Sequence, residues 1–264
     1  MWVVPRGPSS RPIGGAGFLL GGSVGTEMLF LDDSYAREFR GRVVGVEDHS
    51  VALDRTLFYA RGGGQMADRG SLRWYGGTSQ VVAVEKRGDV VYHTLDGPLP
   101  TANEDVSGEI DWDHRYQMMR THTALHVLCG VIFRLYGAQV TGCQMYEDRA
   151  RMDFTLADLS RERIAQIEQA SNEGITSGFP VRSRWIPRRE AELIPQLIRT
   201  KINLVPRHID PIRVVEIVGL DLQADGGTHV ANTLEVGGLK ITKTENKGRE
   251  NRRIEIELLA PRAE

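Results

Sequence analysis

The hydrophobic pattern of the chain changes near residue 111, and this change limits the folds that the chain can adopt. Before it, short apolar runs alternate with polar residues between glycine-rich turns, as in 71–95, which is typical of antiparallel strands. After it, residues 113–137 contain no proline and no glycine before Gly130, and their apolar residues recur every three or four positions. That spacing predicts a long helix, so we expect an α+β protein.

The first part of the chain is predicted to form a small antiparallel barrel or sandwich over residues 28–110. Residues 42–55 alternate around a turn-like stretch, and an insert at 58–70 carries three consecutive glycines. Residues 1–27 mix proline, glycine and serine around a short apolar stretch that glycines interrupt. We interpret them as a flexible extension rather than a signal peptide.

The second part, residues 111–264, is predicted to be an α+β domain. A strand is expected at 149–156, and a second helix begins after Ser160 as N-cap and ends near Gly174. A clear strand at 212–220 follows a short strand and a short helix. Two alternating stretches within 237–258 predict a hairpin with a polar turn.

Composition excludes several classes of protein. The 264 residues carry a formal net charge of −2, so nucleic acid can be bound only through a local basic patch. The two cysteines, Cys129 and Cys143, imply no disulfide framework and favour an intracellular protein. No apolar run approaches the ~20 residues that a membrane span needs. We therefore expect a cytoplasmic protein without a membrane partner.

His122 and His126 lie four residues apart on the predicted long helix. This spacing places both imidazoles on one helix face, as two ligands of one metal require. Thr123 follows His122, so the glutamate of the metalloprotease pattern is absent. A chance pair, with one histidine hydrogen-bonded in the core, is the alternative that this spacing leaves open.

Asp225 and His229 are also four residues apart, but Gly226 and Gly227 between them favour a tight bend over a helix. Such a bend can turn both side chains toward one point. The alternative is an ordinary turn in which Asp225 bonds its own backbone. With the helical pair, these residues would supply four nitrogen and oxygen donors, which suit Zn²⁺ and also other divalent metals.

Two further features could contact a ligand. Three consecutive glycines let a ligand or another backbone approach closely, and their N–H groups can face a carbonyl or phosphate; a flexible hairpin loop is the alternative. Basic residues crowd the last predicted hairpin, where they either contact phosphate or form solvated ion pairs. The hairpin residues are Lys240, Lys243, Lys247, Arg249, Arg252 and Arg253, and a second cluster comprises Arg182, Arg184, Arg188 and Arg189.

The stretches "FYARGGGQMADRG", "RTHTALHVL", "DLQADGGTHV" and "ITKTENKGRENRRIEIEL" resemble the alanyl-tRNA editing proteins, relatives of the editing domain of alanyl-tRNA synthetase. The resemblance covers residues 28–258. It implies an N-terminal β-barrel, then an editing domain with a long metal-binding helix, and hydrolysis of tRNA(Ala) mischarged with serine or glycine. It also implies a zinc site in which His122, His126 and His229 match the family's ligands, whereas Asp225 occupies the position of a cysteine.

The resemblance also implies a substrate pocket. The matching residues are Gly62, Gly63, Gly64 and Gln65 from the glycine-rich stretch, and Thr141, Cys143 and Gln144 from the segment after the long helix. We expect Gln65 to bond a polar group of the substrate and Cys143 to be a small polar pocket residue. A nucleophilic Cys143 is disfavoured because no histidine has a sequence-evident relation to it.

The sequence singles out no catalytic side chain for the implied deacylase. A metal ion could activate a water molecule, or it could orient the substrate while a hydroxyl of the tRNA activates the water. Two other functions stay open: a tRNA-binding module with a closed structural metal site, and a metal hydrolase of small esters or amides. A complete synthetase is disfavoured because no segment is left for an ATP-binding activation domain.

Overall fold

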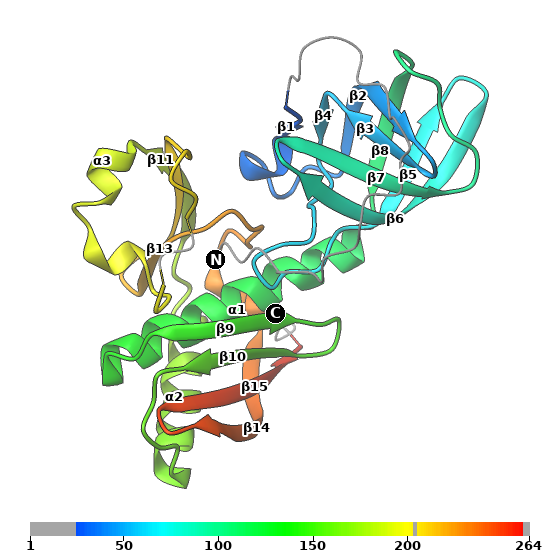
Figure 1. Cartoon of the computed structure of the whole chain (residues 1–264). Coiled ribbons are helices and arrows are strands. Elements are labelled where there is room, and N and C mark those ends of the chain that lie inside the picture. The colour runs from blue at the N-terminus through cyan, green and yellow to red at the C-terminus, as the bar shows by residue number, and fades with distance from the viewer. Residues whose placement is uncertain (1–24, 203–204, 261–264) are drawn as a thin grey trace. The chain divides into compact units, whose positions relative to one another are not determined.

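The computed structural model describes residues 25–202 and 205–260, and its backbone contacts divide the chain into two compact units (Figure 1). The first unit contains the described residues up to Gly62 together with Met66–Arg115. The second contains Gly63–Gln65 and the described residues from Tyr116 onward. Most of the expected extension, residues 1–24, lies outside the described residues. The expected domain limits at 110 and 111 stay predictions.

A closed barrel of six antiparallel strands forms the first unit, with the order β2-β3-β7-β6-β5-β8. This confirms the barrel and excludes a sandwich. The barrel strands are β2 (Glu38–Glu47), β3 (Ser50–Leu53), β5 (Gly70–Trp74), β6 (Gly77–Arg87), β7 (Val90–Asp96) and β8 (Asp105–Ile110). Outside the barrel, β1 (Glu27–Met28) pairs in parallel with β4 (Arg55–Thr56), and a 3₁₀ turn spans Leu29–Leu31.

Strand β8 shows how alternation builds the barrel interior. Val106, Gly108 and Ile110 are buried, whereas the residues between them are exposed, because successive side chains of a strand point to opposite faces. Gly108 faces the ring of Phe39, and an added Cβ would lie 2.1 Å from that ring. Glycine at this position therefore leaves room for an aromatic side chain in a barrel core.

Arg115 and Asp68 form an ion pair inside the first unit, and neither side chain is exposed to solvent. Arg115 Nε lies 3.0 Å from both carboxylate oxygens of Asp68, and Nη1 donates to the carbonyl of Ser34 at 3.0 Å. The carboxylate also accepts from the backbone N–H of Tyr59 at 2.6 Å. The pair ties the first turn of helix α1 (Trp112–Tyr136) to the end of the glycine-rich insert.

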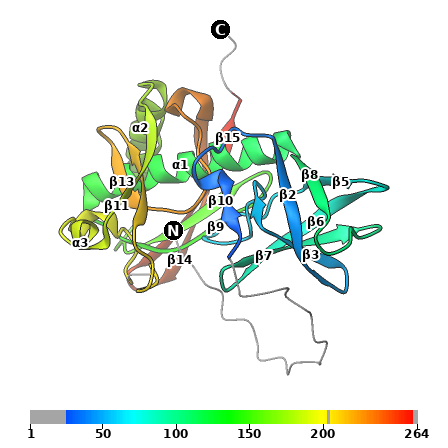
Figure 2. The same cartoon turned by 90° about the horizontal axis from the view of Figure 1, so that it is seen from above.

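Two antiparallel sheets lie in the second unit (Figures 1 and 2). The four-stranded sheet has the order β14-β15-β10-β9, and the three-stranded sheet has the order β11-β12-β13. Their strands are β9 (Val140–Met145), β10 (Ala150–Phe154), β11 (Val181–Ile186), β12 (Ile212–Ile217), β13 (Asp221–Ala224), β14 (Gly238–Gly248) and β15 (Asn251–Leu259). Strands β14 and β15 confirm the predicted hairpin.

Helix α2 (Arg161–Thr176) begins as predicted, because the Ser160 side chain accepts from the backbone N–H of Arg163. Two of its side chains bond the outer edge of β14. Glu168 accepts from the backbone N–H of Ile241 at 2.7 Å, and Asn172 exchanges two bonds of 2.9 Å with the backbone of Leu239. The helix thereby satisfies an edge strand that would otherwise expose unpaired backbone groups.

Strand β13 is the main element that the sequence does not predict. The strand at 212–220 was expected to lead straight into the glycine bend, but β12 ends at Ile217 and a turn returns the chain antiparallel to it as β13. The predicted short helix divides into α3 (Arg188–Ala191) and a 3₁₀ turn at Pro195–Leu197, and another 3₁₀ turn spans Thr233–Val236. Across the described ranges, no helix has both the length and the apolarity needed to cross a membrane.

Candidate metal centre

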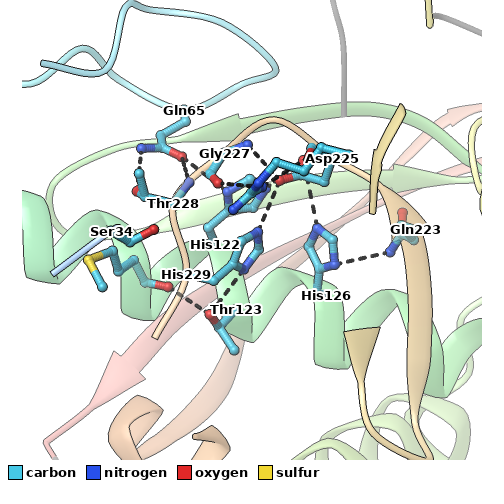
Figure 3. A network of polar contacts seen from close by, with 12 residues as sticks. Ser34, Gln65, His122, Thr123, His126, Gln223, Asp225, Gly227, Thr228 and His229 are labelled. Atoms are coloured by element: carbon cyan, nitrogen blue, oxygen red, sulfur yellow. Dashed lines mark hydrogen bonds and ion pairs between the residues drawn. The ribbon is translucent and has the colours of Figure 1, made fainter. Parts of the chain in front are cut away.

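Four buried side chains of the second unit converge on one point (Figure 3). His122 and His126 project from one face of α1, and Asp225 and His229 lie on the bend that follows β13. One ligand atom from each of the four lies within 4.8 Å of the others. The two spacings of four residues that the sequence singles out are thus brought together in space, as a single metal ion would require.

Thr123 determines which nitrogen of His229 faces this point. Its hydroxyl donates to the carbonyl of Met119 at 2.9 Å and lies 3.2 Å from His229 Nδ1. A hydroxyl has one proton, so toward His229 it must accept, and His229 Nδ1 must donate. The other nitrogen, Nε2, therefore carries the lone pair, and it lies 3.0 Å from Asp225 Oδ2.

The two helical histidines also have polar partners at Nδ1. His122 Nδ1 lies 3.1 Å from the amide oxygen of Gln65, an acceptor, so this nitrogen donates and Nε2 carries the lone pair. His126 Nδ1 lies 3.3 Å from a carboxylate oxygen of Asp221 and 3.5 Å from the amide nitrogen of Gln223. The Nε2 atoms of His122 and His126 lie 3.6 and 4.0 Å from Asp225 Oδ1.

Three imidazoles and a carboxylate therefore face one another in a region closed to solvent, and the Nε2 lone pairs of His122 and His229 point inward. Burial lowers the pKa of His122 well below its usual value and that of His229 to about 4, so both rings are neutral near pH 7. Lone pairs in such an arrangement repel unless a cation lies between them. With this donor set, burial and set of outer hydrogen bonds, the cluster could hold a divalent metal.

The contacts of Asp225 are compatible with both alternatives from the sequence, an ordinary turn and a metal ligand. Its Oδ2 accepts from the backbone N–H of Gly227 at 2.6 Å, which is the bond of an Asx turn. Its Oδ1 faces His122 and His126 and could act as a metal donor. The turn and the donor role are therefore compatible, because they use different oxygens.

The close approach of the bend to α1 requires glycine at position 227. A Cβ added to Gly227 would lie 2.2 Å from Cε1 of His122 and 2.9 Å from the amide oxygen of Gln65. Arg213, which is 5% exposed, holds the bend from the other side and donates at 3.1 Å to the carbonyls of Asp225 and Gly227. The bend is thus fixed by β12 as well as by α1.

The glycine-rich stretch contributes the side chain of Gln65 to the hydrogen bonds around the centre. Both atoms of the buried Gln65 amide are engaged: Nε2 donates to the Thr228 hydroxyl at 2.9 Å, and Oε1 contacts His122 and the Thr228 N–H. Gln65 therefore positions His122 and the bend. Its role as a substrate ligand is a prediction that no observation tests.

Gly64 joins the glycine-rich stretch to strand β9. Its carbonyl accepts from the backbone N–H of Met145 at 2.8 Å and from the Gln144 amide at 3.3 Å. An added Cβ would lie 2.7 Å from the carbonyl oxygen of Cys143. Burial raises the pKa of the Cys143 thiol to about 12, so it is protonated at pH 7 and unsuited to nucleophilic attack.

The remaining expected site residues lie away from the contact between Gly64 and β9, or their side chains bond other residues of the protein. Thr141 bonds Asn251 at 2.8 Å, and Gly62 lies in the first unit, where its carbonyl accepts from Tyr59. Among the basic residues of the hairpin, Arg253 is held by both oxygens of Asp153 at 2.7 and 2.9 Å. Exposed side chains belong to Lys240, Lys243, Lys247 and Arg249.

Around the centre, the sequence does not single out Thr123, Arg213, Asp221, Gln223 and Thr228. Asp221 and Gln223 do carry a signal, since they alternate along β13 and therefore share one face of the strand, and Asp225 follows its end at the same spacing. Recognising that face requires β13 itself to be predicted. Thr123 has no signal beyond its place next to His122.

Two protein-family models match separate parts of the chain. Residues 212–255, which include Asp225 and His229, match the family model described as threonyl and alanyl tRNA synthetase second additional domain. Residues 26–114, which include the barrel strands, match the family model described as tRNA synthetases class II (A). These two regions of the chain are thus similar to parts of tRNA synthetases.

Whole-chain similarity narrows the class to one family. The chain is 40% identical over 233 residues to the alanyl-tRNA editing protein AlaX-M of Saccharolobus solfataricus, covering 87% of this chain and 97% of that protein. It is 42% identical over 243 residues to the AlaX-M of Methanosarcina acetivorans, covering 89% and 99%. The chain belongs to the alanyl-tRNA editing protein family.

The chain also resembles part of an alanine–tRNA ligase. The alanine–tRNA ligase of Hyperthermus butylicus is 42% identical over 225 residues, which cover 83% of this chain and 24% of the ligase. This similarity therefore concerns about a quarter of the ligase.

Proposed function

We propose that the protein hydrolyses the ester between tRNA(Ala) and a wrongly attached serine or glycine. Membership in the alanyl-tRNA editing family supports the substrate class. The observation that carries the chemistry is the convergence of three imidazoles and one carboxylate in a buried centre next to the glycine-rich stretch.

We further propose that the centre holds one zinc ion through Nε2 of His122, His126 and His229 and Oδ1 of Asp225. Zinc accepts these nitrogen and oxygen donors. When bound, it supplies Lewis acidity for ester hydrolysis or for orienting the aminoacyl group. Without a thiolate the donor set is harder than a Cys-containing one, so Co²⁺ and Mn²⁺ are plausible competitors of zinc.

The chain's own residues supply position and selectivity. Gln65 and Thr123 hold two imidazoles by their Nδ1 atoms, and Gly227 brings the bend against His122. The aminoacyl group is proposed to bind where Gly64 meets Cys143 and Gln144, with Thr141 on the same strand. Polar groups that stay unpaired when the serine hydroxyl is missing would make the pocket reject alanine.

The competing function is a tRNA-binding module with a closed metal site. The observation that favours it is the number of donors: four converging ligands fill a tetrahedral zinc site, whereas catalytic sites usually keep one position open. A catalytic site therefore requires an expanded coordination shell or the displacement of Asp225 when substrate binds.

A deacylation assay separates these functions. Purified protein is incubated with tRNA(Ala) charged with labelled serine, glycine or alanine, and release of the amino acid is followed over time. The proposal predicts release of serine or glycine with alanine spared. Equal rates on all three substrates would refute editing, and binding of tRNA without release would establish the module instead.

A further inference from the structure

The third histidine of the centre, His126, is held by a buried network that the family resemblance does not assign. The Asp221 side chain has no solvent exposure, and its Oδ2 lies 3.3 Å from His126 Nδ1. The same oxygen accepts from the Gln223 amide at 2.6 Å. Figure 3 shows Gln223 beside His126, on the side of the ring opposite Asp225.

A positive charge lies behind this carboxylate. Arg199 is 7% exposed, and its Nε donates to Asp221 Oδ1 at 3.3 Å. Its guanidinium stacks on Phe133, a residue of α1, with Cζ 3.7 Å from the ring centroid. A carboxylate buried without a counter-charge would be costly, and Arg199 supplies that counter-charge to Asp221.

Gly130 creates the space for this network. It lies one turn beyond His126 on α1, where alanine would favour the helix more. A Cβ at this position would lie 3.0 Å from Cβ of Asp221 and 3.0 Å from the carbonyl oxygen of Leu220. The turn between β12 and β13 therefore lies close to the helix here, and this approach places Asp221 beside Nδ1 of His126.

We infer that Asp221 is a positioning residue that orients His126 as a metal ligand. Arg199 supplies its counter-charge, and Gly130 leaves the space for it beside α1. Two polar atoms lie at Nδ1, Asp221 Oδ2 at 3.3 Å and the Gln223 amide nitrogen at 3.5 Å, and the nearer carboxylate favours the proton on Nδ1, so that the lone pair of Nε2 points to the centre. A carboxylate partner also increases the basicity of the imidazole toward a cation. The inference rests on the metal site proposed above, and it adds residues that act only through His126.

The test measures zinc affinity of the full chain by competition with a chromophoric chelator, so its readout does not depend on deacylation. Asp221→Asn should weaken zinc binding by about 10- to 100-fold, the usual effect of losing such an outer partner. Gly130→Ala should weaken zinc binding in the same direction without removing a polar group. The absorption spectrum of bound Co²⁺ should change in both variants.

Asp153→Asn is the matched control. Asp153 is 8% exposed and is paired with Arg253 in the same unit, but it has no contact with the four ligands among the interactions of the described residues. The control should lose stability and keep the parental zinc affinity. Parental affinity in both Asp221→Asn and Gly130→Ala would overturn the inference, and so would an equal loss in the control. If the parental chain binds no metal, the centre and the inference fail together.

Discussion

Asp225 uses its two carboxylate oxygens for different contacts. Oδ2 closes the turn onto the backbone of Gly227, and Oδ1 faces two histidines. A thiolate has a single donor atom and could not make both contacts. At this position the chain therefore combines a harder metal donor with a more tightly fixed bend.

Replacing Asp225 with cysteine should change which metal the centre prefers. A thiolate favours zinc over manganese, so Asp225→Cys should raise the ratio of zinc to manganese affinity by about tenfold or more. The ratio is measured by chelator competition with each metal. Asp158→Cys, which adds a thiol at an exposed position, is the control. An unchanged ratio in Asp225→Cys would mean that Asp225 is not a ligand.

Residue spacing predicts part of the centre and misses the rest for a physical reason. The pairs His122–His126 and Asp225–His229 are visible because each lies within one short stretch. The partners of their Nδ1 atoms come from distant stretches: Gln65 lies 57 residues from His122, and Thr123 lies 106 residues from His229. Only the folded chain brings such pairs together, so the sequence does not reveal which ring nitrogen faces the centre.

Helix α1 carries residues of both a buried ion pair and the candidate metal centre. Its first turn carries Arg115 in the ion pair with Asp68, and its middle carries His122 and His126. Periodicity predicts the helix well because apolar residues dominate its buried face. Strand β13 was missed because its four residues are too few for a period to appear and three of them, Asp221, Gln223 and Ala224, are buried despite two being polar.

Breaking the buried pair should destabilise the first unit strongly. Arg115→Met removes one partner and leaves Asp68 buried without its counter-charge, which is expected to cost about 3–5 kcal/mol. The loss is measured by denaturant unfolding. Arg42→Met is the control, because Arg42 and Asp105 pair on the surface with side chains 57% and 77% exposed. A loss in Arg115→Met no larger than in the control would show that the pair has no structural role.

The chain as a whole is slightly acidic, so RNA can be bound only where positive side chains gather on part of the surface. The chain has 33 basic and 35 acidic residues, so its net charge of −2 gives no general attraction to tRNA. The hairpin of β14 and β15 concentrates basic residues, although Glu245 pairs with Lys243 and Lys247. Exposed Arg249, near the tip, lies at the turn between the two strands.

Neutralising Arg249 should weaken tRNA binding through the loss of one phosphate contact. In Arg249→Gln, the slope of log affinity against log salt concentration should fall by about 1, as measured by filter binding at several salt concentrations. Arg161→Gln removes the same charge from an exposed position at the start of α2 and should leave the slope unchanged. Identical slopes in both variants and the parent would exclude the hairpin tip from the RNA interface.

The central claim is that the four converging side chains hold a metal on which deacylation depends. The most direct measurement strips the protein with a chelator, removes the chelator, and titrates zinc while recording hydrolysis of seryl-tRNA(Ala). We expect that stripping abolishes the activity, that about one equivalent of zinc per chain restores it, and that His229→Ala is not restored. Full activity in the stripped protein, or equal restoration of His229→Ala, would contradict the claim.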